Sequence, residues 1–243
     1  MKKNESIIEK VVSERKIQRE KEEQERIQQE QKNQEILSKT SDYLNDVYIK
    51  MKQYPPDFSP IGKWLKKSNW NVSIGEIDVK GVSSSIFTKK LITIECILSD
   101  ISTIEQLKQV IQKRVNDTTQ SNQYISTCFI LPKIKDTELI KIIQDFNHYN
   151  FSPSLYDLFN QEIYYNIKDW KTSFFIRWFK KDETPKSIIG FLEEISDDNN
   201  IFTKSQITEL LHMDEKEINK MFDWLIESNK IIHLKIDEFT LMK

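Results

Sequence analysis

The stretch that decides the fold reads GEIDVKG at residues 75–81 and LITIECILSD at residues 91–100. In the first segment charged side chains alternate with apolar ones, which is the period of a strand with one solvated face. The second segment is a mostly apolar, Ile-rich run with one carboxylate inside it, Glu95. Two paired strands would bring Asp78 and Glu95 together at a sheet end, where two carboxylates can hold a divalent cation.

An acidic residue on one strand, followed by Glu-x-Lys on the next, is the core pattern of the PD-(D/E)xK restriction-endonuclease-like nucleases. This chain resembles that family over roughly residues 61–160. Asp78 and Glu95 match the two carboxylates, whereas Ile97 stands at the position of the family's Lys. The resemblance implies an α/β (α+β) fold with a restriction-endonuclease-like central sheet, flanking helices and a Mg²⁺ ion held by Asp78 and Glu95.

The catalytic lysine of that family has two candidate replacements. Lys80 shares a strand face with Asp78, and Lys108 lies on the helix expected after Glu95. In the family, the helix before these strands commonly supplies another acidic residue, but here that segment offers lysines. These departures predict that nuclease activity is absent or very weak, because losing such a group lowers rates by several powers of ten.

Composition predicts an intracellular, cytoplasmic protein without membrane partners. The chain has 243 residues with a net charge of −2, so no strong general attraction to nucleic acid is expected. Cys96 and Cys128 both lie in apolar runs and are expected to be buried, reduced thiols. No apolar stretch is long enough for a transmembrane helix, and no secretory signal is visible.

Residues 1–52 are expected to form a charged, helical, coiled-coil-like arm. The first 39 residues are rich in Glu, Lys, Gln and Arg, which favour helices, but they contain few apolar residues. Two interpretations stay open: a solvated lone helix or frayed tail, or a weak coiled coil that binds a partner or forms an oligomer. Residues 41–51 have an amphipathic pattern typical of a core-facing helix, and the prolines after residue 53 end it.

Residues 53–160 are expected to form the restriction-endonuclease-like domain. The pattern predicts a short helix over residues 61–68, a helix capped by Thr103 and Gln106, and a polar loop over residues 116–123. The later elements are expected at residues 124–131 (strand), 137–149 (helix) and 154–159 (short strand or turn).

Residues 161–183 are expected to be an aromatic connector. Its rings lie beside Arg177, Lys180 and Lys181, a combination that could stack nucleic-acid bases. The alternative, which we favour, is that the rings pack on the neighbouring cores.

The order of elements expected over residues 184–243 is typical of a winged helix. Three helices are expected, beginning at Pro185, after Thr203 and after Asp214, followed by a two-stranded wing. The apolar face of the third helix would be formed by Ile218, Met221, Phe222, Leu225 and Ile226.

The third helix of this module is acidic rather than basic. Residues 214–227 contain five acidic side chains against two lysines, a net charge of −3. The candidate interaction residues are Glu215, Glu217, Asn219 and Lys220, of which Asn219 alone suits base recognition. A protein partner is therefore favoured over DNA, which stays possible.

Taken together, the sequence predicts a non-catalytic or weakly active nuclease-like subunit or adaptor in a DNA-processing or other macromolecular assembly. One alternative is a metal-dependent DNA endonuclease with a displaced catalytic Lys. Another is a structural assembly factor whose arm and acidic module bind only protein.

Overall fold

The computed structural model describes residues 2–56, 58–59, 63–64, 70–84, 90–121, 123–185, 187–211, 215–227 and 229–242. The fold is mixed α/β, with a six-stranded sheet and a smaller three-stranded sheet. The chain divides into two compact units, Met1–Thr40 and Ser41–Lys243. Among the described residues, no helix combines the length and the apolar character needed to cross a membrane.

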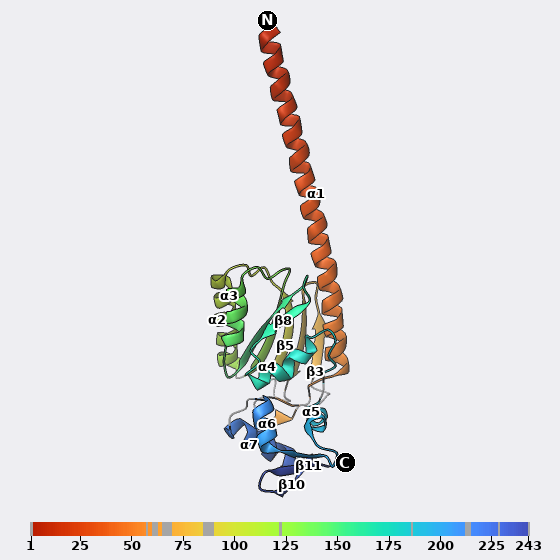
Figure 1. The fold of residues 1–243 in the computed structure, drawn as a ribbon, viewed down its shortest axis with the longest axis vertical. Coiled ribbons are helices and arrows are strands. Elements are labelled where there is room, and N and C mark those ends of the chain that lie inside the picture. Colours follow the sequence, from red (N-terminus) through yellow and green to blue (C-terminus); the bar gives the residue numbers. More distant parts are fainter. Residues whose placement is uncertain are drawn as a thin grey trace. The chain divides into compact units, whose positions relative to one another are not determined.

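The first unit consists of most of α1 (Lys2–Gln53), which is one continuous helix (Figure 1). Side chains between residues 18 and 35 are exposed, and charged ones pair across single turns. The pairs are Lys16–Glu20, Lys21–Glu25, Arg26–Glu23, Arg26–Glu30 and Lys39–Glu35. Each such pair adds only a few tenths of a kcal/mol, about 0.3–0.5, so the helix relies on many local contacts.

The last turns of α1 belong to the second unit and form part of its core. Tyr43, Leu44, Val47 and Met51 are all buried, as the amphipathic pattern predicts. The Tyr43 ring stacks on Tyr156, with ring centroids 3.9 Å apart, and its hydroxyl donates to a main-chain carbonyl of the connector. The helix ends at Gln53, two residues before the first of two consecutive prolines.

The large sheet has the strand order β3-β4-β5-β6-β7-β8. Its strands are β3 (Trp70–Ile74), β4 (Asp78–Ser84), β5 (Lys90–Leu98), β6 (Tyr124–Leu131), β7 (Phe151–Asp157) and β8 (Glu162–Tyr165). The β5–β6 and β6–β7 pairs are parallel, and the other pairs are antiparallel. The parallel crossovers run through α2 (Ile104–Ser121) and α3 (Thr137–Asp145), as parallel strands require.

The two faces of this sheet are covered by different helices. Helices α2 and α3 lie side by side over one face (Figure 1), and their apolar stripes pack on alternate residues of β6 and β7. That core contains Leu107, Ile111, Ile125, Phe129, Leu131, Leu139, Ile143, Phe151 and Leu155. The intervening residues point to the opposite face, where Tyr156 meets Tyr43.

The aromatic connector joins the core of the second unit. It contributes β8, α4 (Trp170–Phe175) and the 3-10 turn η2 (Ile176–Trp178). Phe174, Phe175, Trp178 and Phe179 are buried. Asp169 fixes the start of α4, because its carboxylate accepts bonds from Ser152 (2.9 Å) and from the Thr172 hydroxyl (2.5 Å). These four rings are therefore occupied in packing, as the favoured interpretation of the connector expects, whereas Tyr164 and Tyr165 are half-buried.

The C-terminal part builds a second, smaller core. Its elements are α5 (Ile188–Ile195), β9 (Ile201–Thr203), α6 (Lys204–Leu211), α7 (Glu215–Glu227), β10 (Ile231–Lys235) and β11 (Glu238–Leu241). The strands form a sheet in the order β10-β11-β9. The rings of Phe222 and Phe239 meet edge to face, with centroids 4.4 Å apart, and Phe202 packs beside both.

Capping chemistry is the local signal that the structure confirms best. The Thr103 hydroxyl accepts from the Gln106 N–H at 3.3 Å, and Gln106 Oε1 accepts from the Thr103 N–H at 3.1 Å. Thr203 and Gln206 repeat this arrangement before α6. The cap expected at Asp214 lies outside the described residues. Reciprocal bonds of this kind satisfy N–H groups that a helix start leaves without partners.

Several local expectations are wrong. The loop expected over residues 116–123 is helical to Ser121, and the hydroxyls of Thr118, Thr119 and Ser121 find acceptors in main-chain carbonyls of the preceding turn. Helix α3 ends at Asp145 rather than continuing to residue 149.

Three further expectations concern residues 61–68 and the C-terminal part. The helix expected over residues 61–68 falls mostly outside the described residues, and the two described ones form β2 (Lys63–Trp64), paired with β1 (Phe58–Ser59). Helix α5 begins after a Ser187 cap, not at Pro185. Ile226, expected to face the core, is 39% exposed at the end of α7.

Candidate functional site

The two carboxylates of the predicted metal site lie on neighbouring antiparallel strands. Asp78 opens β4, and Glu95 lies within β5. The register places Lys80 directly opposite Glu95 and Asp78 directly opposite Ile97. All four side chains point to the face that α2 covers, because residues two apart on a strand, and directly paired residues, share a face. Asp78 and Glu95 are therefore diagonal neighbours rather than a direct pair.

Glu95 is a buried carboxylate surrounded by donors. It is 2% exposed, and its Oε1 atom accepts from Arg114 Nη2 at 2.8 Å. The Thr127 hydroxyl donates to the same oxygen at 2.8 Å. Its Oε2 atom lies 3.7 Å from Lys80 Nζ. Two positively charged side chains and a hydroxyl thus surround the buried Glu95 carboxylate.

Arg114 was not expected from the sequence. It lies on α2, and its other guanidinium nitrogen is 3.6 Å from the Asp117 carboxylate. Its position has a signal that could have identified it: Arg114 follows Leu107 by seven residues and Ile111 by three. That spacing places it on the buried stripe of α2, where a basic side chain needs an acidic partner.

Asp78 forms part of the tight turn that precedes β4. The carbonyl of Asp78 accepts from the Gly75 N–H at 2.8 Å. A Cβ atom at position 75 would lie 2.3 Å from Asp78 Oδ1, so a side chain there would displace the carboxylate. The Asp78 side chain therefore lies close against the turn that contains Gly75.

The lysine candidates differ. Lys80 reaches Glu95, whereas Lys108 is exposed on α2 and is absent from the partners that surround Glu95. Within the described ranges, no three His, Cys, Asp or Glu side chains gather closely enough to hold a metal ion. Glu95 also fits Mg²⁺ poorly, because a metal would have to displace a guanidinium and lie near a second cation. The arrangement forms an ion-pair network rather than an open metal site.

No family model, curated protein or solved structure matches this chain. Function is therefore inferred from the geometry of the chain's own residues.

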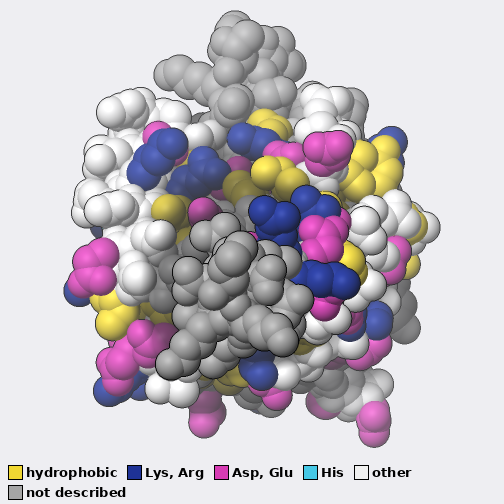
Figure 2. All heavy atoms as spheres, turned by 90° about the horizontal axis from the view of Figure 1, so that it is seen from above, with side chains coloured by type: hydrophobic (Ala, Val, Ile, Leu, Met, Phe, Trp, Pro, Cys, Tyr) yellow, Lys and Arg dark blue, Asp and Glu magenta, His cyan; other side chains and the backbone are white. Residues whose placement is uncertain are grey.

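The three basic connector residues singled out in the sequence each have a partner. Arg177 Nη1 lies 3.7 Å from Glu194, and Lys180 Nζ lies 2.6 Å from Glu183. Lys181 donates to Gln161 at 3.3 Å. Figure 2 likewise shows Lys and Arg side chains interspersed with Asp and Glu on the face it presents. With Phe174, Phe175, Trp178 and Phe179 buried, the connector offers little surface for stacking bases.

The candidate interaction residues of α7 lie partly in solvent. Glu215 and Lys220 are exposed, while Asn219 is half-buried and accepts a bond from Lys204 on α6. The Glu217 side chain lies outside the description. Because Asn219 is held by another helix, the residue best suited to base recognition is already engaged.

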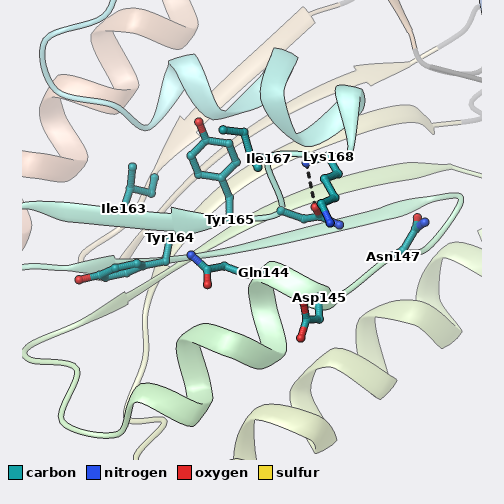
Figure 3. A pocket seen from close by; sticks show the side chains of 9 residues that line it. Gln144, Asp145, Asn147, Ile163, Tyr164, Tyr165, Ile167 and Lys168 are labelled. Atoms are coloured by element: carbon teal, nitrogen blue, oxygen red, sulfur yellow. Dashed lines mark hydrogen bonds between the residues drawn. The ribbon is translucent and has the colours of Figure 1, made fainter. Parts of the chain in front are cut away.

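A cavity of about 560 Å³ lies beside β8, the edge strand of the large sheet (Figure 3). Its lining includes Gln144 and Asn147 from the end of α3 and the loop after it, and Tyr164 and Lys168 from β8 and its exit loop. Figure 3 shows Tyr164 and Tyr165 pointing to opposite sides of the strand. The cavity is at the end of the sheet where β7 begins, whereas Asp78 lies opposite the end of β5.

Proposed function

We propose that this chain is a non-catalytic, nuclease-like subunit or adaptor of a DNA-processing or other macromolecular assembly. One observation carries the proposal. Glu95, the carboxylate that would hold the metal in a nuclease of this kind, is buried and paired with Arg114 at 2.8 Å. A carboxylate occupied in this way is not available to coordinate Mg²⁺.

The order of elements supports the restriction-endonuclease-like assignment. A helix precedes the antiparallel meander β3–β4–β5, and α2 then crosses to β6, which lies parallel beside β5. The candidate acidic positions fall on the second and third strands of that meander. The missing lysine falls at Ile97, directly opposite Asp78. The residues that match the nuclease family and the residue that departs from it therefore all lie on β4 and β5.

A winged helix is the best description of the C-terminal part. Helix, strand, two helices and a hairpin follow one another, and the hairpin extends a sheet begun by β9. Residues 186–243 contain twelve acidic side chains against seven lysines, a net charge of −5. A charge of this sign repels DNA and attracts a basic protein surface, so this module is assigned to protein binding.

The rival function, a metal-dependent endonuclease, has one observation in its favour. The Lys80 ammonium lies 3.7 Å from Glu95 and on the same strand face as Asp78. A displaced catalytic lysine could occupy this position. Its ion pair with Glu95 argues that its charge stabilises the carboxylate instead.

A cleavage assay tests the proposal. The full chain is incubated with plasmid, single-stranded and branched DNA in Mg²⁺ and in Mn²⁺, beside Glu95→Gln and Ile97→Lys. We expect no cleavage by the wild type, and none by Ile97→Lys, because Arg114 still occupies Glu95. Robust wild-type cleavage that disappears in Glu95→Gln would establish the rival function. Cleavage that persists in Glu95→Gln identifies a contaminant.

A further inference from the structure

The edge strand of the small sheet exposes a row of apolar side chains. Ile232, Leu234 and Ile236 alternate along β10 and the turn after it, and are 46%, 49% and 98% exposed. Single exposed apolar residues are common on protein surfaces. Ile232 and Leu234 on this edge strand, with Ile236 in the turn after it, form an exposed apolar stripe, and such stripes mark interaction sites.

The main chain of β10 also has an edge that no strand of the small sheet pairs with. The Met242 N–H donates to the Lys230 carbonyl at 2.9 Å, which sets the phase of hydrogen bonding between β10 and β11. Hydrogen-bonded and non-bonded residue pairs alternate along an antiparallel ladder. The main-chain N–H and C=O groups of Ile232 therefore point toward β11, whereas those of Ile231 and His233 point away from it. An added strand could pair with these groups.

The charge of the module decides what kind of strand fits. A second copy of this chain would bring two modules of net −5 together, which is unfavourable. Within β10 and its turn, Lys235 is already paired with Glu238 at 2.8 Å. In the sequence, Glu227 and Lys230 precede β10 and Asp237 follows it. A basic segment would therefore be attracted where a second copy is repelled.

We propose that β10 is the docking edge for an extended, basic segment of a protein partner, whose alternating apolar side chains cover Ile232, Leu234 and Ile236. This inference rests on the proposed function, because it specifies where the acidic module binds its partner. The segment pairs with the outward main-chain groups of Ile231 and His233. A bulge between His233 and Lys235 interrupts the ladder, so the paired stretch is short.

Binding of a synthetic probe tests the proposal. A fluorescent peptide with alternating Lys and Ile is titrated with the full chain and followed by anisotropy. We expect saturable binding that weakens about tenfold or more in the double variant Ile232→Lys/Leu234→Lys, since it removes two apolar anchors and adds two positive charges. The matched control is Ile74→Lys on β3, one of the two edge strands of the large sheet, where Ile74 is 45% exposed.

Two further probes separate strand pairing from charge attraction. An alternating Glu and Ile peptide should not bind measurably. N-methylation of every second residue removes the main-chain N–H donors along one edge of the Lys and Ile peptide. This methylated peptide should bind less well, because the edge that pairs with β10 can no longer donate hydrogen bonds to it. Amide chemical shifts of Ile231 and His233 should move on addition of the unmodified peptide.

The outcomes distinguish this inference from the proposed function. Equal binding by wild type and the β10 double variant, with loss only in Glu215→Lys, would leave the acidic module as the partner site but overturn docking at β10. Docking at β10 would also be overturned if the Lys and Ile peptide did not bind, or if the acidic peptide bound equally well. The same holds if sedimentation showed a dimer of the wild type that the double variant does not form. Metal-dependent cleavage, measured separately, would overturn the proposed function itself.

Discussion

Arg114 on α2 donates to Glu95 on β5 across 2.8 Å. The pair joins a helix to the strand that it covers, and Lys80 adds a second positive charge from β4 at 3.7 Å. The same residue that would define an active site thus serves to hold helix, strand and strand together.

Replacing Arg114 by Ala should destabilise the fold. Removing one partner of a buried ion pair leaves the Glu95 charge with Lys80 and Thr127 as its remaining donors, and we expect a loss of about 3 kcal/mol in unfolding free energy. Urea unfolding measures it. The matched control is Lys113→Ala, an exposed neighbour on the same helix. If both variants unfold at the same urea concentration, Glu95 does not depend on Arg114.

Removal of residues 1–39 should leave the second compact unit folded, because that unit begins at Ser41. The melting temperature is expected to stay within a few degrees of the full chain. Removal of residues 1–53 should abolish cooperative melting, because it deletes the buried side chains of Tyr43, Leu44, Val47 and Met51. Each buried side chain of this size contributes roughly 2–5 kcal/mol, against a total of about 5–15 kcal/mol for a domain. Similar melting of both truncations would contradict this division.

The arm should behave as a single, ion-paired helix in solution. A peptide of residues 16–39 contains only four apolar side chains, Ile17, Ile27, Ile36 and Leu37, too few for a coiled-coil stripe. Circular dichroism should show helicity that is independent of peptide concentration and falls in about 1 M salt, where screening weakens the charge pairs. A peptide of the same composition with its charges moved off i,i+4 spacing should be less helical. Helicity that rises with concentration would instead indicate a coiled coil.

Stability should fall in alkaline solution through Tyr156. Burial, more than the nearby thiols, raises the pKa of Tyr156 from its usual 10.0 to about 12. The folded chain therefore holds this proton more tightly than the unfolded chain, so the contribution is fully present below pH 10 and is lost as pH rises toward 12. Burial also raises the pKa of Cys96, in the same direction.

Urea midpoints between pH 8 and 12 measure this effect. The urea midpoint of Tyr156→Phe should decline less steeply with pH than that of the wild type. The midpoint of Tyr149→Phe, at a residue that is 56% exposed, should follow that of the wild type. Parallel curves for wild type and Tyr156→Phe would show that this hydroxyl does not govern alkaline unfolding.

Much of the fold could be predicted where local chemistry is strong. The strand over residues 124–131 was located to the residue, and the Thr103–Gln106 cap places the start of α2. Strands β3, β8 and β9 were not delimited, because short edge strands have weak periodicity and are stabilised by the neighbour that pairs with them. The helical end of α2 was missed because its polar side chains read as a loop until their bonds to main-chain carbonyls are seen.

By itself, the sequence determined the two strands with Asp78 and Glu95, the absence of a lysine at residue 97, the charge of the arm and the acidity of the C-terminal part. Only the tertiary structure decided which groups meet. It placed Arg114, nineteen positions after Glu95 in the sequence, against that carboxylate, and left Lys108 in solvent. The reason is that strand alternation fixes the face on which Glu95 lies, whereas the helix that covers this face is chosen by the chain path and by burial of its apolar stripe.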